Sequence, residues 1–118
     1  MFLIREDERP EIFAVDARGK LTKEDYEMLI PRMLAAAEKQ GPLRLMISLE
    51  DFEGWAPSAL WEDIKFDLKH QDDLEKIAVV GQEDVEKWGT KLSKPFFKAP
   101  IKYFQEGNEE AARRWLMQ

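Results

Sequence analysis

The chain has 118 residues, of which 44% are hydrophobic and 36% charged, and its formal net charge is −6. This length and balance predict one globular domain over residues 1–118. The lack of cysteine excludes disulfides and thiolate zinc sites, and the acidic balance argues against nucleic-acid binding. Apolar runs are too short for a signal peptide or a membrane span, so we expect a cytoplasmic location.

The first two predicted elements are strands. Residues 1–5 (MFLIR) and 11–17 (EIFAVDA) are apolar runs separated by a charged turn, a pattern typical of a β-hairpin. Gly19 is expected to end the second strand.

A helix is predicted next, over residues 23–40. Thr22 is expected as its N-cap, with Asp25 three residues later in the manner of a capping box, and Gly41 closes the pattern. Pro31 interrupts the helical spacing of apolar residues, and an interior proline removes a backbone hydrogen bond. We therefore expect either a kink at Pro31 or the first turn of a new helix.

The remaining elements alternate between strands and helices. In chain order, we predict a strand over 43–49, a helix within 52–70, a strand over 76–81, a helix over 83–92, a strand over 99–104 and a helix over 108–117 begun by Asn108. A hairpin followed by such alternation indicates an α/β fold with a mixed, mainly parallel sheet of about five strands and about four helices.

The strand predicted over 43–49 (LRLMISL) has two unlike faces. Leucine and isoleucine occupy one face, and Arg44, Met46 and Ser48 occupy the other, so helices are expected to cover only one face fully. Some cover is expected on the second face, because sheets with parallel strands seldom leave a face bare. The predicted core consists of Leu45, Ile47, Trp61, Ile64, Leu68, Val79 and Trp115.

Five segments resemble the SpoIIAA-like family of small bacterial proteins: LTKEDYEMLIP at 21–31, FEGWAPSALWEDIKFDLKH at 52–70, IAVVG at 77–81, EKW at 86–88 and RRWL at 113–116. Together they span nearly the whole chain, and the segment at 52–70 is the most specific. The resemblance implies a STAS-like fold, which is related to the anti-sigma-factor antagonists and to the lipid-binding CRAL-TRIO domains.

The resemblance also implies a place to look for phosphorylation. Related STAS antagonists are phosphorylated on a serine at the start of the helix after a central strand, and Ser58 is its counterpart. Those proteins place an aspartate directly before the serine, whereas Pro57 precedes it here. Acidic residues at positions 50, 51 and 53 would also repel a phosphate. Phosphorylation is therefore not expected to carry over to Ser58.

The start of the helix within 52–70 is a candidate binding site. With Pro57 at the first helical position, Ala56 becomes the N-cap, and Trp55 is placed to pack on Leu60 as a hydrophobic staple. An alanine cap leaves the first-turn amides without a side-chain acceptor, so Trp55 and Ser58 are candidate contacts for an anion or ligand. The alternative is that water or a neighbouring loop caps this turn.

Catalytic machinery is not indicated. His70 is the only histidine, no G-x-S-x-G motif surrounds a serine, and the six glycines form no phosphate-binding loop. Acidic residues follow two predicted strands and could ligate Mg²⁺ or Ca²⁺, but acids at helix starts are already explained by the macrodipole. We expect no enzyme activity, no catalytic residues, no cofactor and no metal. The acids are Glu50, Asp51, Glu53, Glu83 and Asp84.

Residues 87–105 hold five lysines and no acid. Their stems can cover apolar surface while the heads stay in water, or the segment can dock to an anionic partner. Because the whole chain is acidic, we expect no stable membrane association. The lysines are Lys87, Lys91, Lys94, Lys98 and Lys102.

These observations favour a non-enzymatic STAS-like regulatory or protein-interaction module that forms a homodimer. Phe66 points away from the apolar stripe of its predicted helix, and Ala59 and His70 extend the same surface, so these three residues form the candidate partner interface. The alternative function is a carrier or sensor of a small apolar or lipid-like ligand, held between sheet and helices.

Phe66→Glu tests this predicted interface. We expect a folded monomer in place of a wild-type dimer, because the change would bury an unpaired charge between the two copies. Light scattering measures the mass. A monomeric wild type, or a variant that stays dimeric, would contradict the interface, and an unfolded variant would show that Phe66 is covered within its own chain.

Overall fold

The computed structural model describes residues 1–5, 9–55, 74–82 and 99–118, and it describes the backbone but not the side chain of Trp55. These residues form one five-stranded sheet in the order β1-β2-β3-β4-β5, so that each strand lies beside the next one along the chain. The strands are β1 (Phe2–Arg5), β2 (Ile12–Leu21), β3 (Leu43–Trp55), β4 (Leu74–Gly81) and β5 (Ile101–Gln105).

Strand β1 is antiparallel to β2, and the remaining neighbours are all parallel. The predicted mixed sheet with an N-terminal hairpin is therefore confirmed. Among the described residues there are two helices, α1 (Lys23–Gln40) and α3 (Glu109–Leu116), against about four expected. The helices predicted within 52–70 and 83–92 lie almost entirely outside the described residues.

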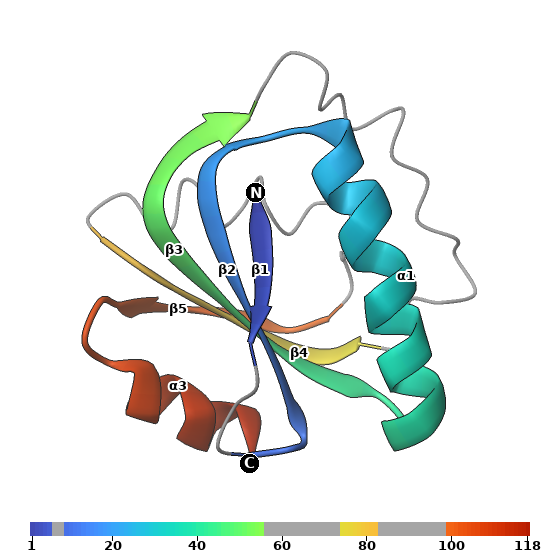
Figure 1. The fold of residues 1–118 in the computed structure, drawn as a ribbon. Helices are drawn as coiled ribbons and strands as arrows, with labels where there is room; N and C mark the ends of the chain where they lie inside the picture. The colour runs from blue at the N-terminus through green and yellow to red at the C-terminus, as the bar shows by residue number, and fades with distance from the viewer. Residues whose placement is uncertain (6–8, 56–73, 83–98) are drawn as a thin grey trace.

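The two helices lie on opposite faces of the sheet, with β1 at one open edge between them (Figure 1). Each helix covers its own hydrophobic cluster, which separates the core into two layers. The predicted cover on the second face is thus confirmed, and α3 provides it.

The ends of α1 are those that the sequence predicts. The Thr22 hydroxyl accepts a hydrogen bond from the Asp25 amide at 3.2 Å, and the Asp25 carboxylate accepts one from the Thr22 amide at 2.8 Å. Gly41, at φ 85°, donates its amide to the carbonyl of Ala37. The helix runs unbroken through Pro31, so the expectation of a new helix start there was wrong.

Two strands run further than the sequence predicted. Strand β2 does not end at Gly19 but continues to Leu21. Gly19 has a left-handed backbone conformation (φ 61°), and the register with β3 shifts on both sides of it. The pairing absorbs the irregularity as a bulge and continues beyond it. Strand β3 does not end at Leu49 but continues to Trp55, so the first residues of the segment 52–70 are strand. The acidic residues expected after the strand over 43–49 therefore lie within β3.

The core layer beneath α1 contains three of the predicted core residues, Leu45, Ile47 and Val79, each at most 1% exposed. Tyr26 of α1 is fully buried, and its ring meets that of Phe2 edge to face at 5.1 Å. This contact ties the edge strand to the helix. Three other predicted core residues, Trp61, Ile64 and Leu68, lie outside the described residues.

The layer beneath α3 is smaller and includes the buried Met46. Trp115 is only partly buried, so the expectation that it would be nearly inaccessible was wrong. Its ring packs against Phe104 and lies beneath the Lys76 ammonium, 5.0 Å from the ring centre. The same ammonium donates to the carbonyls of Trp115 and Gln118, which fixes the end of α3 to β4.

Replacement of the N-cap of α1 should lower stability. Thr22→Ala removes the oxygen that accepts the Asp25 amide, and we expect a loss of about 1 kcal/mol in the free energy of unfolding. Thr22→Ser is the matched control and should retain most of the stability. Urea denaturation measures both. Equal losses in the two variants would show that the methyl group rather than the cap is responsible.

Candidate functional site

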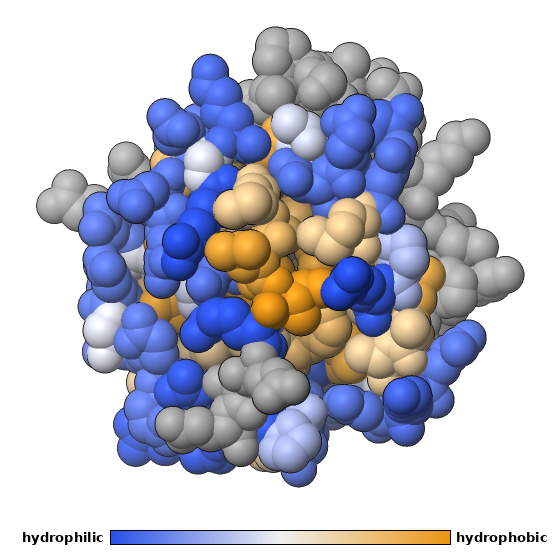
Figure 2. Space-filling view, viewed as in Figure 1, coloured by the Kyte–Doolittle hydropathy of each residue, from blue (hydrophilic) through white to orange (hydrophobic). Residues whose placement is uncertain are grey.

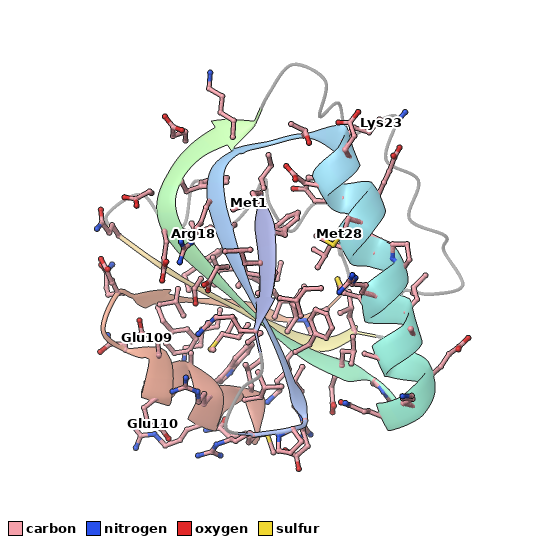
Figure 3. The ribbon with its side chains drawn as sticks, in the orientation of Figure 1. Met1, Arg18, Lys23, Met28, Glu109 and Glu110 are labelled. Atoms are coloured by element: carbon pink, nitrogen blue, oxygen red, sulfur yellow. The ribbon has the colours of Figure 1, made fainter. Side chains whose placement is uncertain are left out.

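The exposed large apolar side chains among the described residues lie on β1 and on the adjoining side of α1. Met1 is 51% exposed, and Leu3 and Met28 are 38% exposed each. We call these three residues the β1 patch. Figure 2 shows apolar residues gathered over β1 and the adjoining side of α1, with hydrophilic residues around them. Met1 lies at the start of β1, and Met28 lies on the side of α1 turned toward the strand (Figure 3).

The backbone of β1 has hydrogen-bonding groups that point out of the sheet. Met1 and Arg18 exchange both of their backbone hydrogen bonds, at 2.7 and 2.9 Å. In an antiparallel pair such residues alternate with residues whose amide and carbonyl groups point away from the partner strand. Phe2 and Ile4 occupy the alternate positions. Their backbone groups therefore face the open edge.

Beside the β1 patch, five polar side chains of β1, β2 and β3 form what we call the charged cluster. They lie on the α3 face, in line with Ala14 and Met46 on the same strands. The members are Arg5, Asp16, Arg18, Ser48 and Glu50.

Two guanidinium groups hold the charged cluster together. The Arg5 Nε lies 2.8 Å from Asp16 Oδ1, and its Nη2 donates to the Ser48 hydroxyl at 3.3 Å. The Arg18 Nη2 lies 2.5 Å from Glu50 and 3.7 Å from Asp16. These contacts join the hairpin to the central strand β3.

Asp16 is the most deeply buried charged residue among those described, at 4% exposure. Its Oδ1 forms the ion pair with Arg5 at 2.8 Å. Burial raises the pKa of Asp16 above its ordinary value of 3.8, and the charge on Arg5 offsets this only in part. The carboxylate of Glu50 adds to the increase.

The charges of the cluster balance, because two guanidinium groups meet two carboxylates. It therefore offers no excess charge with which to attract an anion or a cation. Within the described ranges, acidic and histidine side chains form no group that could hold a metal ion. The contacts of the cluster link β1 and β2 to β3.

A hollow lies at the opposite end of the sheet, where β3 and β4 begin. Its volume is about 340 Å³, and its lining is mostly polar or proline: Pro10, Glu11, Gln40, Pro42, Arg44 and Glu75. The Arg44 guanidinium lies 3.5 Å from Glu75.

Of the candidate acids, Glu50 belongs to the charged cluster. The residues predicted to contact a ligand or a partner are not among those that form these features. Ser58, Ala59, Phe66 and His70 lie outside the described residues, and so does the side chain of Trp55, whose backbone ends β3. Sequence reasoning missed the β1 patch. The available signal was the run MFLI, in which no charged residue or proline protects a short terminal strand.

The described residues form a five-stranded mixed sheet with an N-terminal hairpin and a helix on each face, which defines an α/β protein. A family model described as SpoIIAA-like matches residues 12–117. The chain belongs to the SpoIIAA-like family.

A solved structure supports this assignment. It is the 2.25 Å crystal structure of an uncharacterized protein of the DUF3478 family, with a SpoIIAA-like fold, from Shewanella loihica PV-4. Its TM-score is 0.73 at 28% sequence identity, and the match covers 98% of this chain and 93% of that chain. A comparison with curated proteins gives no match. Within the described ranges, no helix is long and apolar enough to cross a membrane.

The raised pKa of Asp16 makes stability depend on pH. For an acid whose pKa is higher in the folded chain, the stabilising contribution is fully present below the unfolded value of 3.8 and is lost as pH rises through the folded value. Asp16→Asn removes this titration. We expect the free energy of unfolding of the wild type, relative to Asp16→Asn, to fall as pH rises above 3.8.

Urea denaturation of both proteins across the acidic and neutral range measures this difference. A difference that stays constant, or that grows in favour of the wild type as pH rises, would contradict the raised pKa. In that case the ion pairs with Arg5 and Arg18 outweigh the cost of burying the carboxylate.

Proposed function

We propose that this chain is a non-enzymatic protein-interaction module that acts in the cytoplasm as a homodimer. The observation that carries the proposal is the β1 patch. Three large, exposed apolar side chains lie on or beside β1, and the backbone amide and carbonyl groups of Phe2 and Ile4 in this strand point away from the sheet. Exposed apolar surface next to open strand edges is typical of sites where another protein binds.

The charged cluster supports a structural role rather than catalysis. Its guanidinium groups are engaged with the carboxylates beside them, and Ser48 accepts a hydrogen bond from Arg5. A serine nucleophile needs a neighbouring base, and the contacts of Ser48 here include a cation instead. The proposal therefore assigns these side chains to holding the edge strand in place.

The alternative, a carrier of a small apolar or lipid-like ligand, needs an apolar cavity between sheet and helices. Among the described residues, the hollow beside Arg44 lies at one end of the sheet rather than between sheet and helices, and Glu11, Arg44 and Glu75 place charges around it. We therefore place the interaction module first and let the same experiment distinguish the two.

Native mass spectrometry of freshly purified protein without an N-terminal tag tests the proposal. We expect a bare dimer, with a dimer fraction that rises with concentration. A monomer that retains an adduct of lipid mass would replace the interaction module with the carrier. A bare monomer at every concentration would overturn the homodimer.

A further inference from the structure

We propose that β1 pairs edge to edge with β1 of a second copy, antiparallel and centred on Leu3, so that the two sheets join into one. This inference rests on the proposed homodimer and specifies its interface. It places the two-fold axis at Leu3 and assigns the contacts made by each residue of the strand.

The backbone of β1 is self-complementary in this register. The outward groups belong to Phe2 and Ile4, which stand on either side of Leu3. When two copies run antiparallel about Leu3, Phe2 of one chain lies opposite Ile4 of the other. Each pair can exchange both backbone hydrogen bonds, and the two-fold axis creates the pair twice. Every outward amide and carbonyl of these residues then has a partner.

The side chains fit the same register. Leu3 lies opposite Leu3 of the second copy in a non-hydrogen-bonded antiparallel pair. In this type of pair the two Cα atoms are closer, and the side chains contact one another most directly. Met1 lies on the same face as Leu3, opposite the aliphatic stem of the second copy's Arg5. On the other face, Ile4 meets the second copy's Phe2, and the Met28 side chains of the two copies lie on this same face, because a two-fold axis normal to the sheet brings both α1 helices to one side. The pairing thus covers the whole β1 patch.

The edge of β1 lacks the residues that usually prevent strands from pairing with another chain. Strand edges that must stay free are usually protected by lysine, proline or an inward charge. Phe2, Leu3 and Ile4 include none of these, and the one charged residue of β1, Arg5, directs its guanidinium to Asp16 and Ser48. The opposite edge strand, β5, differs because it carries the exposed Lys102.

A second copy suits this edge better than an unrelated extended peptide. The hydrogen-bonding groups of Phe2 and Ile4 are spaced symmetrically about one residue, and the apolar side chains on both faces of the strand are matched by the same set in the partner. The ring contact of Phe2 with Tyr26 and the ion pair of Arg5 already hold β1 in place. The strand therefore loses little conformational freedom when it pairs.

Leu3→Lys tests the interface. It places two ammonium groups opposite each other across the two-fold axis, which we expect to weaken dimerisation by about tenfold or more. Gln105→Lys on β5 is the matched control, since it adds the same charge to an exposed position of the other edge strand. Sedimentation velocity measures the dissociation constants, and circular dichroism verifies that both variants are folded.

Leu3→Cys tests the register without adding charge. The chain has no cysteine, so the new thiol is unique, and directly opposed residues at this type of pair lie within the range a disulfide can span. We expect rapid formation of a disulfide-linked dimer on mild oxidation, and little from Gln105→Cys under the same conditions. Non-reducing electrophoresis measures the yield.

The outcomes separate this inference from the proposed function. A wild-type dimer that Leu3→Lys leaves intact and that Leu3→Cys does not cross-link would overturn the β1 interface while the homodimer stands. Loss of that dimer in Phe66→Glu alone would then assign the interface to the surface predicted from the sequence. A wild type that is monomeric at every concentration would overturn both proposals.

Discussion

The pairing of β2 with β3 is the constraint on which the rest of the described structure depends. Ten residues of β2 have partners on β3, and alternation of side chains along both strands decides what each face carries. One face is apolar along its length and receives α1. The other face is divided, with Ala14 and Met46 beneath α3 and Asp16 and Ser48 beside β1. The position of the charged cluster follows from this division.

The charged cluster is a compromise between two requirements. The hairpin must lie against β3, yet α3 is too short to cover the whole second face. Arg5 and Arg18 extend from neighbouring strands over Asp16 and supply part of the missing cover. Burying the carboxylate costs free energy, as its raised pKa shows, and the two guanidinium groups reduce that cost.

Local patterns were sufficient to predict most of the described fold. The capping residues Thr22 and Asp25, the alternation in LRLMISL and the buried run IAVVG each identified their element, because the signal lies within a few neighbouring residues. Strand ends were less predictable. Gly19 is a usual strand terminator, but here the partner strand tolerates register shifts and the pairing continues.

The surface features were harder to predict because they depend on residues distant in sequence. Arg5 and Asp16 are brought together only by the hairpin, and Ser48 only by the parallel pairing with β3. The exposure of Leu3 depends on β1 lying at the sheet edge, which strand composition alone does not determine. Trp115 was expected to be nearly inaccessible, but it packs against the border of the layer beneath α3 and is only partly buried.

The order of the strands has a consequence for how the chain folds during synthesis. Because each of the five described strands pairs with the next one along the chain, β1, β2, α1 and β3 can assemble as soon as they leave the ribosome. The layer beneath α3 cannot be completed at that stage, because Ile12, Ala14 and Met46 are covered by a helix that begins only at Glu109. The nascent chain therefore exposes this apolar surface until α3 has emerged and packed against it.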